Sequence, residues 1–125
     1  MNENEISYKI RGAIFKVYNS FGPGLLESVY VNALLIELRN NGLSVQKEVP
    51  IPVFYNEENL NIGFRLDILV NKKVIIEVKS VEGIADVHHK QILTYLKLTY
   101  YKLGILVNFN VDDIKRGIFR KVNGL

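Results

Sequence analysis

The chain has 125 residues, of which 48% are hydrophobic and 23% are charged, and its formal net charge is +3 at pH 7. This is the composition of an ordinary globular protein, and the length suits a single domain over residues 1–125 with a core of its own. The lack of cysteine excludes disulfides, thiolate zinc sites and a cysteine nucleophile, and the lack of a signal peptide or a long apolar run predicts a cytoplasmic protein without a membrane span.

The first forty residues carry two stretches of helical periodicity. Apolar residues recur every three or four positions from Glu5 to Phe21, which predicts an amphipathic helix. Gly22-Pro23-Gly24 interrupts this pattern. A second helix is expected to begin at Pro23 or Gly24 and to run to Asn40, where Asn41-Gly42 favours a left-handed stop.

The rest of the chain predicts strands around a third helix. Strands are expected at residues 43–55, 60–70, 74–79, 105–107 and 117–122. Pro50 and Pro52 mark the first of them as an edge or irregular strand, and a turn at 56–59 follows it. Asp86 is expected to cap a helix that reaches about Tyr101. This order predicts an α/β fold in which a mixed central β-sheet is flanked by α-helices.

The segment from Phe64 to Lys79 alternates between apolar and charged residues. One side is predicted to hold Phe64, Leu66, Ile68, Val70, Val74, Ile76 and Val78, and the other side Arg65, Asp67, Glu77 and Lys79. If Asn71-Lys72-Lys73 closes a hairpin as a three-residue loop, Val70 pairs with Val74 and Ile68 pairs with Ile76. The same register sets Asp67 opposite Glu77, and Arg65 opposite Lys79.

Asp67 and Glu77 are therefore candidate metal ligands. Side chains that face each other in an antiparallel pair have Cβ atoms about 5 Å apart, and two carboxylates so close repel each other unless positive charge lies between them. A divalent cation would supply that charge, and Lys79 could act on a water beside it. The alternative is an exposed salt-bridge ladder worth less than about 1 kcal/mol per pair. Leu69 and Ile75 share this face and favour the metal site, because they predict that the face is covered.

Two helices offer further polar candidates. Glu27 begins an apolar stripe of the second helix and, taken alone, is best explained as an acid that favours the positive helix end. Gln91 and Tyr95 share a face of the third helix with His88, and their simplest explanation is the polar edge of an amphipathic helix. His89 is expected on a solvated face, since adjacent histidines point in different directions on a helix and cannot form a ready metal pair.

The order of several short motifs resembles that of a known family. Gly24-Leu-Leu-Glu27-Ser-Val-Tyr30 reproduces the Gly-x-x-Glu-x-x-Tyr signature of the GxxExxY family, which is placed in the PD-(D/E)XK nuclease superfamily. The further motifs are Asp67…Glu77-Val-Lys79, Gln91-x-x-x-Tyr95, Gly104-Ile-Leu-Val-Asn-Phe109 and the basic Lys115-Arg116. The chain departs from the superfamily pattern in one respect: Leu66, and not proline, precedes Asp67.

The resemblance implies a restriction-endonuclease-like core and a role for each motif residue. Asp67, Glu77 and the backbone carbonyl of Val78 would hold Mg²⁺ or Mn²⁺, which prefer oxygen ligands. Lys79 would orient or deprotonate the attacking water or stabilise charge on the phosphate. Glu27 would support the metal or the water, and Gln91 and Tyr95 would line the site. The implied reaction is hydrolysis of phosphodiester bonds.

The resemblance also implies nucleic acid, and DNA in preference to RNA, as the partner of a bacterial protein in repair or defence. Phosphate contacts are expected from Lys72, Lys73, Lys90, Lys115 and Arg116. A homodimer or a protein partner is compatible with a small domain of this kind, although no symmetric interface can be read from the sequence. The alternative function is a catalytically silent accessory or nucleic-acid-binding protein that keeps the nuclease fold.

Overall fold

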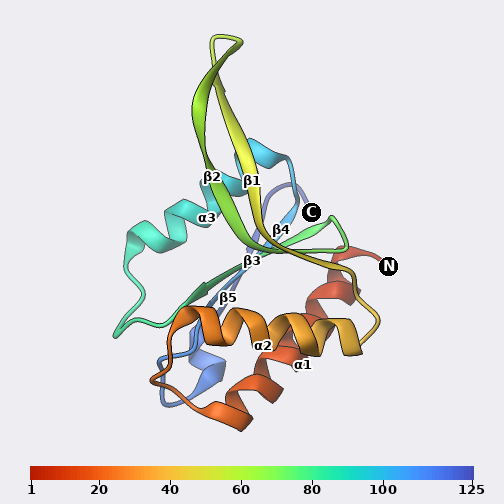
Figure 1. The fold of residues 1–125 in the computed structure, drawn as a ribbon, viewed down its shortest axis with the longest axis vertical. Helices are drawn as coiled ribbons and strands as arrows, with labels where there is room; N and C mark the ends of the chain where they lie inside the picture. Colours follow the sequence, from red (N-terminus) through yellow and green to blue (C-terminus); the bar gives the residue numbers. More distant parts are fainter.

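The computed structural model describes all 125 residues and contains one five-stranded sheet with helices on both of its faces (Figure 1). The helices are α1 (Glu3–Phe21), α2 (Glu27–Asn40), α3 (Asp86–Thr99) and the short 3-10 helix η1 (Ile114–Gly117). The strands are β1 (Val45–Tyr55), β2 (Glu58–Val70), β3 (Val74–Lys79), β4 (Leu103–Asn108) and β5 (Ile118–Val122). The strand order is β1-β2-β3-β4-β5, and only β3 and β4 run parallel. The predicted α/β fold with a mixed central sheet is confirmed.

The core lies mainly between the sheet and the two N-terminal helices. Twenty buried residues form a single cluster, most of them from α1, α2 and one face of β2, β3 and β4, together with Leu43, Phe109 and Ile114. A smaller cluster on the other face joins Leu66, Leu69 and Ile75 to Leu96 of α3. The face that carries Leu69 and Ile75 is therefore covered, as the sequence predicts.

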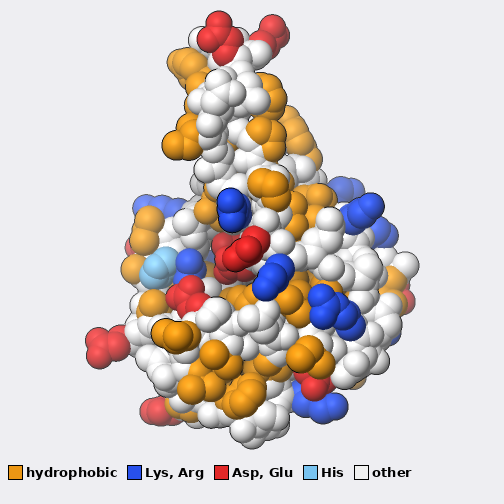
Figure 2. All heavy atoms as spheres, in the orientation of Figure 1, with side chains coloured by type: hydrophobic (Ala, Val, Ile, Leu, Met, Phe, Trp, Pro, Cys, Tyr) orange, Lys and Arg blue, Asp and Glu red, His pale blue; other side chains and the backbone are white.

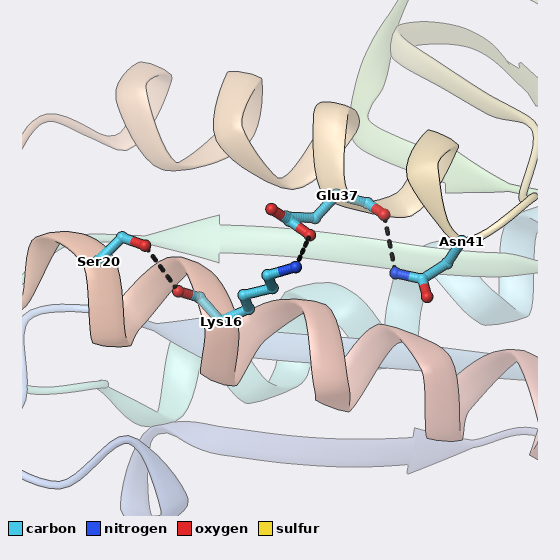
Figure 3. Close-up of polar contacts among 4 residues, drawn as sticks. All are labelled: Lys16, Ser20, Glu37 and Asn41. Atoms are coloured by element: carbon cyan, nitrogen blue, oxygen red, sulfur yellow. Dashed lines mark hydrogen bonds and ion pairs between the residues drawn. The ribbon is translucent and has the colours of Figure 1, made fainter.

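The N-terminal helices form by local rules and pack as a pair. At the start of α1 the side chain of Asn2 accepts a hydrogen bond from the amide of Glu5, and the Glu5 carboxylate accepts one from the amide of Asn2, which is a capping box. Between the helices, Lys16 and Glu37 form an ion pair of 3.5 Å (Figure 3). Such exposed pairs are worth less than about 1 kcal/mol, so burial of the apolar faces is the main contribution to helix packing.

Two predicted helix starts differ from the structure. The α2 helix begins at Glu27 instead of Pro23 or Gly24, because Gly22 and Gly24 adopt positive φ values of 66° and 103°. The α3 helix is capped by Ala85, and Asp86 is its first helical residue, so the prediction of Asp86 as the cap is wrong. The physical reason is that the side chain of His88, through Nδ1, accepts a hydrogen bond from the Ala85 amide at 3.0 Å.

The hairpin register is confirmed near the turn: Val70 pairs with Val74, and Ile68 with Ile76. The predicted side assignment is wrong beyond it, since Leu66 packs on the α3 side whereas Ile68 packs on the α1–α2 side. The regular alternation stops between these two residues, at Asp67. Here β1 is also irregular, because Glu48 has a φ of 52° and neither Glu48 nor Asp67 belongs to a paired position of the β1–β2 ladder.

The outer part of the β1–β2 hairpin projects from the body of the molecule (Figure 1). We call residues 48–64 the arm. Its tip is a tight turn with positive φ at Asn56 and Glu57, so β2 begins at Glu58, slightly earlier than predicted. None of the helices is both long and apolar enough to cross a membrane.

Candidate functional site

Asp67 and Glu77 lie where β2 and β3 stop pairing, one position beyond the Ile68–Ile76 pair. Their side chains replace the missing backbone ladder. Glu77 Oε2 accepts a hydrogen bond from the Asp67 amide at 2.9 Å, and Asp67 Oδ2 accepts one from the Val78 amide at 2.8 Å. These reciprocal bonds hold the two carboxylates between diverging strands and leave the second oxygen of each available to a ligand.

Burial makes the charged forms of these carboxylates unfavourable. Glu77 is only 4% exposed, and burial together with the charge of Asp67 raises its pKa from 4.5 to about 8. Burial also raises the pKa of Asp67, although the Val78 amide and the Lys79 ammonium act in the opposite direction. A bound cation would favour the ionised form of both groups.

Lys79 ends β3 two residues after Glu77 and is half-buried. Its positive charge lowers the pKa of both carboxylates, which places the ammonium group within electrostatic reach of them. The predicted position of Arg65 opposite Lys79 is wrong, because the β2–β3 ladder ends at Ile68 and Arg65 pairs with Pro50 of β1.

Glu27 extends from the start of α2 towards the end of β3. Its Oε2 atom accepts a hydrogen bond from the amide of Ser80 at 3.3 Å, and the Ser80 hydroxyl donates to the carbonyl of Leu25 at 2.6 Å. The charge of Glu27 raises the pKa of both Asp67 and Glu77. The structure therefore brings this predicted residue to the carboxylate pair, and a cavity of about 280 Å³ lies between Glu27 and Asp67.

Tyr95 reaches the site from α3, on the other face of the sheet. Its ring stacks on Phe64 with a centroid distance of 4.1 Å and an interplanar angle of 7°. Burial raises the pKa of Tyr95, and the charges of Glu77 and Asp67 raise it further, so the hydroxyl lies within their field. Gln91 lies one turn earlier on α3 and is half-buried, and its side chain makes no hydrogen bond within the chain.

The predicted basic residues do not form one surface around the carboxylates. Lys72 and Lys73 occupy the turn between β2 and β3, at the opposite end of β3 from Lys79 and thus roughly 20 Å away along the strand. Lys115 and Arg116 are exposed in η1. This helix follows the end of β4 at which Asn108 pairs with Lys79, so both residues lie at the same end of the sheet as Lys79. The remaining predicted contact, Lys90, is exposed on α3. Figure 2 shows acidic and basic side chains gathered in the middle of one face, below the base of the arm.

Three residues near the site were missed by sequence reasoning. Glu48 and Lys47 line the same cavity as Glu27 and Asp67, and the charge of Glu48 raises the pKa of Asp67. No local motif identifies them, because they approach the site only through the pairing of β1 with β2. Asn108 is 1% exposed, and its side chain binds the amide and the carbonyl of Val81, which holds the loop after Lys79. It belongs to the Gly104–Phe109 motif of the family resemblance, which gave it no role, and its position beside Lys79 in β4 is the further signal.

His89 is not on a solvated face, so that prediction is wrong. It is half-buried, with its ring edge-to-face against Phe119 of β5 at 4.8 Å, because α3 packs on β5. Burial and the nearby Lys121 lower its pKa. The side chain of His88 accepts a hydrogen bond from the Ala85 amide at the start of α3. Neither histidine is available as a metal ligand at the carboxylate pair.

The donor set suits a hard divalent cation. No three His, Cys, Asp or Glu side chains lie close enough to hold a metal by themselves, so a cation here would need backbone or water oxygens besides Asp67 and Glu77. The free oxygens of these two carboxylates and the Val78 carbonyl are oxygen donors of the kind that Mg²⁺ and Mn²⁺ accept, and Mg²⁺ usually keeps several waters. The residues therefore fit such an ion.

Comparison with known proteins identifies the superfamily and the fold of the chain. A sequence model described as the PD-(D/E)XK nuclease superfamily matches residues 4–121. No curated protein matches the chain. A solved structure, titled "Crystal structure of SSO0001", superposes with a TM-score of 0.55 at 24% identity and covers 78% of this chain and 50% of that one. The chain thus spans about half the length of that protein, and the likeness shows the fold. Because the family match extends over nearly the whole sequence, the chain belongs to the PD-(D/E)XK nuclease superfamily.

Proposed function

We propose that the protein is a metal-dependent nuclease that hydrolyses phosphodiester bonds of DNA, in repair or defence. The observation that carries the proposal is the reciprocal bonding of Asp67 and Glu77 across the open end of the β2–β3 pair, with Lys79 next along β3. Superfamily membership supports nuclease chemistry in general. The substrate, the metal and the residue roles are our inference.

Asp67, Glu77 and the carbonyl of Val78 would hold Mg²⁺ or Mn²⁺. When bound, the ion lowers the pKa of a water and neutralises charge that develops on the scissile phosphate. The hydrogen bonds from the Asp67 and Val78 amides fix one oxygen of each carboxylate, so the free oxygens have a defined direction before any ion binds. Preorganised ligands of this kind lower the cost of binding.

Lys79, Glu27 and Tyr95 would act on the substrate and the water around the carboxylate pair. The ammonium group of Lys79 donates hydrogen bonds and can stabilise a phosphate oxygen or orient the water. Glu27 lies across the cavity from Asp67 and would accept a hydrogen bond from the same water. Tyr95 and, one turn away, Gln91 would donate to the phosphate from the α3 side of the sheet.

We also propose that the chain belongs, more narrowly, to the GxxExxY family, since each signature residue has a structural task. Gly24 has a φ of 103°, which favours glycine. Glu27 binds the Ser80 amide beside the carboxylates. The Tyr30 hydroxyl donates to the carbonyl of Gly22 at 2.6 Å and accepts from the amide of Leu25 at 3.2 Å, which holds the turn that presents Glu27.

Phosphate contacts are proposed for Lys115 and Arg116, which lie at the same end of the sheet as Lys79, and for Lys90 on α3. Lys47 and Arg65 flank the site more closely and extend this proposal. Lys72 and Lys73 would contact only a long nucleic acid that follows the sheet to its other end. Reversal of charge at Lys115 should weaken DNA binding and reduce its dependence on salt.

The direct test is cleavage by the purified protein in Mg²⁺ or Mn²⁺ of single-stranded, duplex and branched DNA and of RNA. Asp67→Asn and Lys79→Ala should abolish cleavage, and Lys9→Ala is the matched control for loss of a lysine far from the carboxylates, since Lys9 lies on α1 against Asn41 at the far end of α2. Cleavage that survives both site substitutions would come from a contaminant and would refute the assignment of the site.

The accessory function has one observation in its favour. Burial and the charge of Asp67 raise the pKa of Glu77 to about 8, so without a bound cation the carboxylate pair is not fully ionised at neutral pH. A protein that binds metal and nucleic acid but cuts none of these substrates would fit that function and contradict the nuclease proposal.

A further inference from the structure

The arm leaves large apolar side chains without a covering layer. Beyond Ile68, β2 pairs only with β1, so the arm is a two-stranded ribbon. Its base is packed on α3 through the Phe64–Tyr95 stack. Further out, the exposed fractions are 59% for Phe54 and 72% for Ile62. An isolated two-stranded hairpin is only marginally stable in water, and exposed apolar groups of this size are typical of an interaction surface.

The charge of the arm disfavours a polyanion as its partner. Residues 48–64 contain three glutamates, Glu48, Glu57 and Glu58, and no lysine or arginine. Two of these acids lie at the tip, which Figure 2 shows as acidic side chains at the far end of the projection. Phosphate groups of nucleic acid or of an anionic membrane would be repelled there. The partner should therefore be a protein surface that is apolar and positively charged.

The outer face of α3 has this complementary character. Residues 87–102 contain three lysines and no acidic residue. Leu93 and Lys97 lie one turn apart on the exposed side of α3, and the exposed Tyr100 follows directly after the helix. Leu93 and Leu98 are each more than two-fifths exposed, and Tyr100 is 86% exposed. The segment thus combines apolar and cationic groups, whereas the arm combines apolar and anionic ones.

The arm and α3 are neighbours within one molecule, because Phe64 and Ile51 of the arm share a cluster with Tyr95 and Leu96 of α3. Neighbouring surfaces that complement each other are what a two-fold dimer requires, since each copy then offers both halves of the contact. Pairing of arm with arm through β1 is disfavoured by Pro50 and Pro52, and the acidic tips of two arms would repel each other.

We propose that two copies of the chain form a two-fold dimer in which the arm of each lies on the outer face of α3 of the other. Phe54 and Ile62 would supply apolar contacts to Leu93 and Leu98, and Glu58 would approach Lys97. The interface is independent of the carboxylate pair, so it goes beyond the proposed nuclease function and does not need it to be correct.

Sedimentation velocity over a wide range of protein concentration, with EDTA present, tests this interface. The wild-type chain should show a monomer–dimer equilibrium. Ile62→Ser should weaken dimerisation by about tenfold or more through loss of an apolar anchor. Glu58→Lys and Lys97→Glu should each weaken it by at least about tenfold, because like charges are then brought together. Arg11→Glu makes the same charge reversal on α1 and should leave dimerisation unchanged.

The double variant Glu58→Lys/Lys97→Glu identifies the pair of surfaces, since the reversed charges should restore dimerisation. Circular dichroism checks that each variant is folded. A wild-type chain that stays monomeric at every concentration overturns the proposal. So does a dimer that is insensitive to these substitutions, or a double variant that is no better than either single one. Loss of DNA binding in Ile62→Ser, with no change in dimerisation, would show instead that the arm contacts nucleic acid.

Discussion

Glu77→Gln removes the ionisable group that burial disfavours most, and we expect it to stabilise the metal-free protein at high pH. The amide oxygen of glutamine can still accept the hydrogen bond that Glu77 takes from the Asp67 amide. The substitution therefore keeps the local geometry and removes only the negative charge. At pH values where Glu77 is already protonated, the two proteins should have similar stability.

The magnitude follows from the pKa shift. The folded chain raises the pKa of Glu77 from 4.5 to about 8, so the folded state binds a proton that the unfolded state releases. Its contribution to stability is full below pH 4.5 and is lost as the pH rises through about 8, at roughly 1.4 kcal/mol per pH unit and roughly 5 kcal/mol in total. Asp67, whose pKa is raised as well, adds a slope of the same sign to both proteins.

Urea unfolding of the wild-type and Glu77→Gln proteins in EDTA, at pH 5 and at pH 8, measures this difference. The free energies of unfolding should be close at pH 5, and the variant should be the more stable at pH 8 by a few kcal/mol. Saturating Mg²⁺ at pH 8 should stabilise the wild type and not the variant, since only the ionised pair binds it. Equal pH dependence of the two proteins in EDTA would refute our account of the buried carboxylate.

Three further substitutions test the fold and the support of the site. Gly12 lies in the exposed middle of α1, where a Cβ would meet open space. Gly12→Ala should therefore stabilise the protein by about 1 kcal/mol in urea unfolding. An unchanged midpoint of the urea transition would contradict this. Gly63→Ala should destabilise the protein by about 1–3 kcal/mol, because the new Cβ would collide with the carbonyl oxygen of Ile51 in the arm. The backbone amides of the arm should then exchange hydrogen faster. Unchanged exchange would count against the close contact. Asn108→Ala leaves the amide and carbonyl of Val81 unpaired and should lower the free energy of unfolding by about 1–3 kcal/mol. Hydrogen exchange at the Val81 amide should be faster. An equally stable variant would show that water replaces the side chain.

Local patterns were sufficient for most of the fold. Helical spacing in α1, the Asn41-Gly42 stop and the alternation around Val70 and Val74 depend on neighbours in sequence, and each was predicted correctly. The alternation failed at Asp67 because its side chain, and not its backbone, completes the ladder there. Sequence periodicity assumes a regular strand and cannot anticipate such an exchange.

The site was predictable to the extent that its residues carry motifs. Glu27 and Tyr95 were found because each belongs to a short motif of the family, although neither stands out in charge or hydropathy. Glu48 was missed because it reaches Asp67 only through the β1–β2 register. His89 was misplaced because the contact with Phe119 joins residues that are far apart in sequence.

The binding of Mn²⁺, measured by calorimetry at pH 8 for the wild type, Asp67→Asn and Lys79→Ala, tests the central claim most directly. We predict that the wild type binds the ion, that Asp67→Asn loses this binding, and that Lys79→Ala keeps it because the lysine is not a ligand. Binding of equal strength in the wild type and in Asp67→Asn would contradict the assignment of the carboxylate pair as the metal site.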